Sequence, residues 1–228
     1  MKPGPRIVWH NGPRDEAGPA GADWTAHHGD HALRFRYPAG EAWSEQRFDL
    51  GDAYPEIWIR YWLRVPRNFQ HGAGNPSNHK FFALWMDGYS QHGKGPTIVW
   101  NFWRQADGNS RFSFSHSKDP VGAGHHGLAP DFLVSPRDRG RWMQIVLYAK
   151  MSSAPAKNDG EARIWRRWQD EKDFALISET VGRGFHAPED GPQGWSAGYI
   201  LGWANAAYAE DTEWLLDAFT VSDQSLLE

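Results

Sequence analysis

The 228-residue sequence contains no cysteine, which excludes both a disulfide framework and a thiolate metal site. No stretch approaches the roughly 18 to 20 apolar residues that span a bilayer, and the first residues run polar, without the apolar segment of a secretory signal. A basic block is also lacking, since 24 basic and 28 acidic residues give a net charge of -4. We therefore expect neither a membrane nor a nucleic acid as partner.

The sequence is instead rich in tryptophan, glycine and proline, with 14, 24 and 15 residues respectively. Glycine and proline divide the chain into short segments, which disfavours long helices. Tryptophan at this density is typical of a thick aromatic core or of a stacking surface. The length suits one domain, so we predict an irregular N-terminal arm over residues 1–31 and a single sandwich domain over residues 32–228.

The clearest strand signal lies at residues 56–65, where odd and even positions differ in chemistry. The odd positions from Ile57 to Val65 are apolar, whereas the even positions are Glu56, Trp58, Arg60, Trp62 and Arg64. Successive side chains of a strand point to opposite faces, so the odd set predicts a core face and the even set a second face of indoles and guanidinium groups. Two interpretations stay open for that second face. It lines a groove for a sugar chain, or Trp58 and Trp62 are covered by another layer or a loop.

A similar alternation recurs at residues 142–151, and these two strands are expected to share a sheet. The turn signal Asn158-Asp159-Gly160 predicts a hairpin with a strand at 161–168. About ten short strands with little helix favour an all-β fold, a two-sheet antiparallel sandwich. The other strands are predicted at 32–37, 44–50, 78–86, 97–104, 111–116, 198–203 and 213–222, with loops at 66–78, 88–96 and 117–140 and a short helix at 169–177.

The order of these segments resembles the concanavalin A-like jelly roll, and within it the polysaccharide-lyase-like branch. The residues that carry the likeness lie at 43–51, 59–66, 78–82, 142–150 and 158–165. In that branch a Lys-bearing strand, here 78–82, and a Trp-x-x-Ile strand, here 142–145, flank the groove. The resemblance extends over roughly residues 30–223 and implies a fold more than a function, because the same sandwich serves lectins, glycosidases, lyases and structural modules.

The sequence also departs from parts of this family. It lacks the Glu-x-Asp-x-Glu motif of the glycosidase branch, which places two carboxylates on one strand face. The Gln-Ile-His and Tyr-Phe-Lys motifs that mark alginate lyases are missing too. Jelly rolls of this kind also occur on bacteriophage virions, and the polar N-terminus without cysteine is compatible with that setting.

Candidate catalytic residues follow from what a lyase needs on a uronate: a group that neutralises the carboxylate, a base for the C5 proton and an acid for the leaving oxygen. If their strands are neighbours, Arg60 and Lys80 would neutralise the carboxylate. His79 or Tyr148 would be the base, and Tyr148 or Lys150 the acid. The alternative is that Arg60 and Lys150 pair with acidic neighbours and that Tyr148 packs with its hydroxyl hydrogen-bonded.

Binding a sugar demands less than catalysis. Trp58 and Trp62 could stack on pyranose faces, and arginines could hold acidic substituents through paired hydrogen bonds. The other candidate substrate-binding residues are Arg64, Asn101, Arg104 and Gln144.

The eleven histidines do not form a zinc-binding pattern. The resemblance instead implies a structural calcium that ties the N-terminal arm to the closing strands, with Asp30 and Asp217 as its candidate oxygen ligands. No cofactor is required by the functions considered.

Three functions therefore remain open. The leading hypothesis is glycan binding on a particle or cell surface, as a virion accessory protein with a polysaccharide and other virion subunits as partners. Its rival is a polysaccharide lyase that cleaves a uronate-containing polymer by β-elimination. The third is a structural role in which a partner subunit covers Trp58 and Trp62. The direction in which those two indoles point separates the three.

Overall fold

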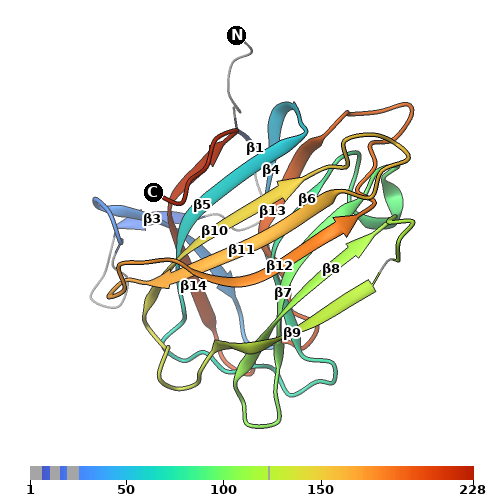
Figure 1. Ribbon diagram of the computed structural model, residues 1–228. Helices are drawn as coiled ribbons and strands as arrows, with labels where there is room; N and C mark the ends of the chain where they lie inside the picture. The colour runs from blue at the N-terminus through green and yellow to red at the C-terminus, as the bar shows by residue number, and fades with distance from the viewer. Residues whose placement is uncertain (1–6, 11–15, 20–25, 123) are drawn as a thin grey trace.

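The computed structural model describes residues 7–10, 16–19, 26–122 and 124–228, which fold into two antiparallel seven-stranded sheets packed face to face (Figure 1). Sheet A has the order β1 (Val8–His10), β4 (Trp43–Tyr54), β13 (Trp195–Trp203), β6 (Asn78–Trp85), β7 (Thr97–Arg104), β8 (Ser110–Ser117) and β9 (Gly124–Leu133). Sheet B has the order β12 (Ala175–Arg183), β11 (Gly160–Trp168), β10 (Trp142–Lys150), β5 (Glu56–Arg64), β14 (Thr212–Ser222), β3 (His31–Tyr37) and β2 (Glu16–Pro19). The predicted two-sheet antiparallel sandwich is confirmed.

Helix plays almost no part in the described residues, where a single 3-10 turn, η1 (Ser90–His92), interrupts the strands. Nothing in that part of the chain forms a helix of the length and apolarity that crossing a bilayer requires.

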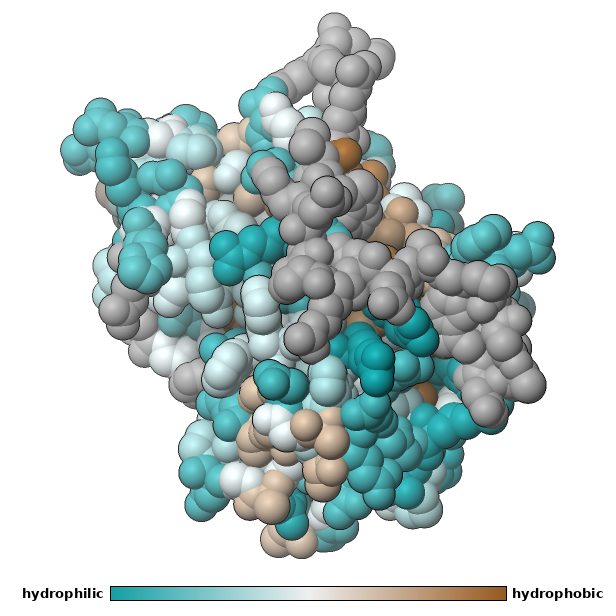
Figure 2. Space-filling view, turned by 180° about the vertical axis from the view of Figure 1, so that it is seen from behind, coloured by the Kyte–Doolittle hydropathy of each residue, from teal (hydrophilic) through white to brown (hydrophobic). Residues whose placement is uncertain are grey.

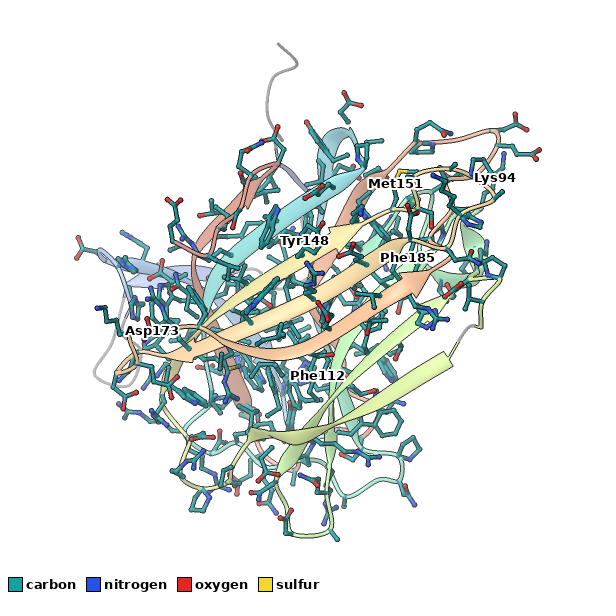
Figure 3. The ribbon with its side chains drawn as sticks, viewed as in Figure 1. Lys94, Phe112, Tyr148, Met151, Asp173 and Phe185 are labelled. Carbon is teal, nitrogen blue, oxygen red and sulfur yellow. The ribbon has the colours of Figure 1, made fainter. Side chains whose placement is uncertain are left out.

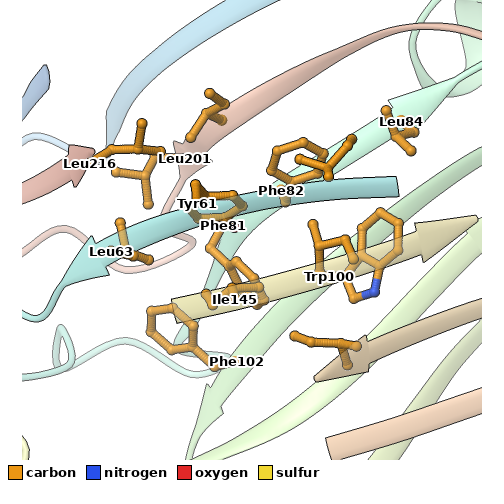
Figure 4. Packing of buried hydrophobic residues seen from close by; sticks show 14 of the residues in the cluster. Tyr61, Leu63, Phe81, Phe82, Leu84, Trp100, Phe102, Ile145, Leu201 and Leu216 are labelled. Carbon is orange, nitrogen blue, oxygen red and sulfur yellow. The ribbon is translucent and has the colours of Figure 1, made fainter. Parts of the chain in front are cut away.

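The core lies between the two sheets and is largely aromatic (Figure 4). The alternation at residues 56–65 works as predicted, because Ile57, Ile59, Tyr61 and Leu63 are fully buried against it. Tyr61 stacks on Phe82 of the opposite sheet with ring centroids 5.7 Å apart. Full burial of each such side chain contributes about 1.5–3 kcal/mol, so this aromatic layer is the main reason that the sheets stay together.

Strand β5 lies between β10 and β14 in sheet B. Its register with β10 runs from Arg64 opposite Trp142 to Glu56 opposite Lys150. The expectation that residues 56–65 and 142–151 share a sheet is therefore confirmed, and the predicted hairpin forms, since β10 also pairs with β11.

Two local expectations are wrong. Residues 169–177 do not form a helix: the chain turns and enters β12 at Ala175, where it pairs with the edge of β11. The predicted loop at 117–140 contains β9, which pairs with β8. In both places the local sequence has only a weak preference for one secondary structure, and hydrogen bonding to a sheet edge makes the segment a strand.

The N-terminal arm adds one edge strand to each sheet, because β1 pairs with β4 and β2 pairs with β3. The predicted arm, residues 1–31, falls only partly on described residues: 1–6, 11–15 and 20–25 lie outside them.

Candidate functional site

The outer face of sheet A, turned away from the core, carries a row of residues that the strand register places side by side. Arg47 of β4, Tyr199 of β13, Ala83 of β6, Val99 of β7 and Ser115 of β8 are successive neighbours across five strands. The middle of this row is small and apolar, whereas its ends are polar. Ala83 and Tyr199 are buried, whereas Val99 and Ser115 line an open hollow.

A hollow of about 150 Å³ opens above part of this row, and we call it the Lys80 hollow. A β-bulge between Lys80 and Phe82 shapes it, because both Phe81 and Phe82 enter the core while Lys80 stays outside. Lys80 lies directly opposite Asn101 on β7. The residues that line the hollow are Lys80, Tyr89, Ser90, Thr97, Val99, Asn101, Ser115, His116 and Ser117.

Aromatic rings bound one side of the Lys80 hollow. Tyr89, Trp85 and Tyr199 form a small cluster separate from the main core, with the Tyr89 and Tyr199 rings 5.4 Å apart. The two phenol oxygens lie 3.4 Å from each other. Burial, followed by the nearby Tyr89, raises the pKa of the Tyr199 phenol well above its ordinary value. Burial therefore makes the Tyr199 hydroxyl a weaker acid than an exposed phenol, and it serves as a hydrogen-bonding neighbour of Tyr89.

Positive charge borders this aromatic cluster. The guanidinium carbon of Arg47 lies 5.9 Å from the centre of the Trp85 ring and 6.0 Å from that of Tyr89. Its Nε donates to Oε1 of Glu45 at 2.5 Å. Arg47 is thus paired with Glu45, and Lys80 is the cation that lines the hollow, where it suits an anionic group of a sugar.

Asn101 is fully buried and supports the hollow from below. Its Nδ2 donates to the Ser115 hydroxyl at 2.9 Å and to the Val99 carbonyl at 3.2 Å. Its Oδ1 accepts from Nδ2 of Asn78 at 3.4 Å. These contacts make Asn101 a positioning residue for Ser115.

No protein-family model matches the sequence, and no curated protein matches it. Solved structures share its fold. A doubly substituted alginate lyase, Aly36B, in complex with an alginate trisaccharide, superposes with a TM-score of 0.67 at 13% identity, covering 97% of this chain and 99% of that chain. The concanavalin A-like jelly roll is the fold of this protein.

Two further solved structures give the same result. The marine alginate lyase from Aplysia kurodai has a TM-score of 0.62 at 11% identity, covering 86% of this chain and 84% of that chain. An alginate lyase from a Chlorella virus has a TM-score of 0.60 at 11% identity, covering 94% and 91%. Identities this low show a shared jelly roll and leave the activity to be argued from the site.

The jelly roll separates the predicted catalytic residues. Lys80 lies on the outer face of sheet A, but Arg60, Tyr148 and Lys150 lie on the outer face of sheet B, where Figure 3 labels Tyr148 on the side turned to the viewer. Two packed sheets and the whole core lie between these faces. The expectation that they act together on one substrate is therefore wrong, and the Lys-bearing and Trp-x-x-Ile strands do not flank one groove.

The residues on sheet B have structural partners instead. Arg60 donates to the carbonyls of Leu226 and Glu228 at the C-terminus, at 3.1 and 3.2 Å. Lys150 forms an ion pair with Glu161 at 3.2 Å. Burial, and then the charge of Glu56, raises the pKa of the Tyr148 phenol.

His79 points into the core and is not available as a base for an external substrate. It is 1% exposed, lies next to Lys80 on β6 and therefore faces the other way. Its Nδ1 lies 2.6 Å from the Tyr208 hydroxyl and its Nε2 3.0 Å from the Tyr37 hydroxyl.

Most of the predicted substrate-binding residues are also on sheet B or turned from the Lys80 hollow. Trp58 packs on Tyr148 and on Trp165, at 4.5 and 5.5 Å between centroids. Trp62 is only 6% exposed, because the His27 ring stacks on it at 3.7 Å. The interpretation in which a loop covers Trp62 is the one that the structure supports.

The polar members of the same set are engaged locally. Arg64 Nε donates to the Gly140 carbonyl at 3.1 Å, and Oε1 of Gln144 accepts from Arg167 at 2.8 Å. Arg104 ends β7 on the side opposite to Asn101, since the two positions differ in parity.

The predicted calcium ligands do not fit a cation. Oδ2 of Asp217 accepts the backbone N–H groups of His27 and His28 at 2.8 and 2.7 Å, and its Oδ1 accepts that of Ala218 at 2.6 Å. Amide hydrogens around both oxygens repel a metal ion. Asp30 is exposed in the turn before β3, and the described residues contain no group of three or more His, Asp or Glu side chains able to hold a metal.

Sequence reasoning missed Arg47, Trp85, Tyr89, Tyr199 and Ser115. Alternation along residues 195–203 could have placed Tyr199 on the face away from Ile200. Their assembly depends on which strands are neighbours, and that information is absent from any single strand.

Figure 2 shows the side of the molecule opposite to β10, β11 and β12, where hydrophilic residues surround smaller apolar patches.

Proposed function

We propose that this jelly roll binds an acidic polysaccharide on the outer face of sheet A, centred on the Lys80 hollow. The observation that carries the proposal is the meeting of Lys80, the Tyr89 phenol and several serine and threonine hydroxyls beside Val99 at one hollow. A sugar ring can place its apolar face on Val99, its hydroxyls can pair with Ser115 and Tyr89, and a carboxylate substituent can pair with Lys80.

Cleavage by β-elimination is the second candidate, favoured by the full-length fold similarity to several alginate lyases. In this reaction the C5 proton leaves to a base, a double bond forms between C4 and C5, and the C4–oxygen bond breaks as that oxygen takes a proton. Lys80 would stabilise the charge that develops on the carboxylate. Tyr89, whose hydroxyl lies 3.4 Å from that of Tyr199, would give a proton to the leaving oxygen.

Binding remains the leading function because it needs only groups that the hollow holds ready. Elimination also needs a base for the C5 proton. Lys80 cannot be that base while its charge pairs with the carboxylate, so Tyr89 would have to take the C5 proton and pass it to the leaving oxygen. The location on a virion or outside a cell, and a role beside other virion subunits, stay predictions.

Calorimetry with acidic and neutral polysaccharides tests the proposal. We expect binding to uronate-containing polymers such as alginate, weakened by salt because charge contributes to it. Lys80→Ala should weaken binding at least tenfold, the loss of one charge-assisted contact of about 1.5–3 kcal/mol. Lys150→Ala, which removes a lysine from sheet B, is the matched control and should bind as the unsubstituted protein does.

The same samples separate the two candidates. Ultraviolet absorbance that grows with time would report the conjugated double bond of an elimination product and establish the lyase. Binding without such absorbance supports the binding module alone. Absence of binding to every acidic polymer, or equal losses in Lys80→Ala and Lys150→Ala, would contradict the proposed site.

A further inference from the structure

Two tryptophans on sheet A are exposed in a way that the core does not explain. Trp43 and Trp203 are 41% and 49% exposed, the most exposed of the tryptophans whose side chains the structure describes. The register places them directly opposite each other on the neighbouring strands β4 and β13 (Figure 1). Opposite residues of an antiparallel pair leave the sheet on the same side, so the two indoles form one surface.

The backbone and a buried carboxylate hold this pair outward. Leu201, with φ 51, interrupts the alternation of β13, so that Leu201 enters the core before Trp203 emerges at the strand end. Trp43 Nε1 donates to Oε2 of Glu45 at 3.3 Å, and Glu45 is only 7% exposed. A Trp43 indole tied to a buried acceptor is oriented in advance, which reduces the entropy lost when a ligand stacks on it.

A continuous line of contacts joins the indole pair to the Lys80 hollow. Glu45 accepts from Trp43 through one oxygen and from Arg47 through the other. Arg47 in turn lies over Tyr89, which lines the hollow. Trp43 is four residues from Arg47 along β4, a distance of about 13 Å. A single pyranose ring is shorter than that, so only a longer oligosaccharide can reach both places.

We propose that Trp43 and Trp203 form a distal stacking subsite on the same outer face of sheet A, occupied by sugar units beyond those held in the Lys80 hollow. This inference rests on the proposed acidic-polysaccharide binding and specifies its ligand as an extended chain. Rings stack on the indoles through their apolar faces, and Arg47 lies between the two places to pair with a carboxylate of the connecting units. The polar contacts along this line and its continuity with the hollow favour a sugar polymer over an apolar partner.

A length series of uronate oligosaccharides tests the inference, with Trp43→Ala, Trp203→Ala and the double variant compared by calorimetry. We expect the double variant to lose about tenfold or more in affinity for long oligomers and to bind the shortest ones unchanged. Trp165→Ala, a tryptophan on sheet B, is the matched control, and a melting curve of each variant checks that it folds.

The outcomes are distinguishable from failure of the proposed function. If the unsubstituted protein binds no acidic oligomer, both the function and the subsite are refuted. If it binds and the double variant binds long oligomers equally well, only the subsite is refuted. Sedimentation tests whether a second copy of the chain covers the indoles instead. A dimer that becomes a monomer in the double variant would assign the indoles to that interface and overturn the inference.

Discussion

Acid should destabilise this protein through two histidines that fold in the neutral form. Burial lowers the pKa of His79 to about 3 and that of His71 to about 4. In the unfolded chain both titrate near the ordinary value of 6.5. Below pH 6.5 these histidines bind protons in the unfolded state but stay neutral in the folded state, so acid favours unfolding.

The hydrogen bonds of His79 explain why its ring stays neutral in the folded state. The hydroxyl of Tyr37 contacts the carbonyl of Gly202 at 2.8 Å and that of Ser44 at 2.9 Å, and it can donate to only one of them. It is therefore free to accept from Nε2–H of His79, and Nδ1 of the ring accepts from the Tyr208 hydroxyl. A second proton would remove that acceptor inside the core, without a carboxylate among these partners to balance the charge.

The size of the effect follows from linkage. Each histidine contributes stability that is fully present above pH 6.5 and is lost at about 1.4 kcal/mol per pH unit as the pH falls toward its folded value. Between pH 7 and pH 5, the titration of His79 and that of His71 should each lower the free energy of unfolding by about 2 kcal/mol. A domain with a total stability of about 5–15 kcal/mol would show this clearly.

Urea unfolding at half-unit steps from pH 7.5 to pH 4.5 measures this loss. The loss of unfolding free energy per pH unit should be smaller in His79→Gln by the contribution of one histidine. In the double variant with His71→Gln it should be smaller by the contributions of both, whatever the stability of the variants at neutral pH. An unchanged slope in the double variant would refute the assignment of buried neutral histidines.

Three further predictions concern the contacts around the sheets. Asp217→Ala should lower the free energy of unfolding by about 1–3 kcal/mol, because two backbone N–H groups of the arm lose their acceptor. Urea unfolding measures this loss, with Asp217→Asn as the comparison. Equal stability of Asp217→Ala and the unsubstituted protein would contradict the role of Asp217 as that acceptor. Gly202→Ala should lower the melting temperature, since Gly202 has φ 151 and an added Cβ would lie 3.0 Å from the Tyr199 ring. Tyr199→Phe should keep that temperature but, if the protein is a lyase, slow product formation, because the Tyr89 hydroxyl loses its contact with that of Tyr199; unchanged rates would show that Tyr199 does not position Tyr89.

The fold was predictable because its main signal is local. Alternation at residues 56–65 and 142–151 depends only on the two-residue period of a strand, and these residues form β5 and β10 as expected. Residues 169–177 carry a weaker signal, and the last three of them begin β12, which pairs with the edge of β11.

The site was harder to predict because exposure depends on what lies above each face. Trp58 and Trp62 occupy the outer positions that alternation assigns, but Trp165 and His27 pack on them. His79 and Lys80 were both candidates for contact with a substrate, although adjacent strand residues face opposite ways. Which of the two faces the core depends on partners from distant strands, and Tyr37 and Tyr208 hold His79 there.

The most direct test of the account is the affinity of the protein for an acidic polysaccharide, measured by calorimetry with lysines substituted one at a time on opposite sheets. The account predicts that Lys80→Ala weakens binding at least tenfold and that Lys150→Ala leaves it unchanged. Binding that depends on Lys150 and not on Lys80 would place the functional face on sheet B and contradict the central claim.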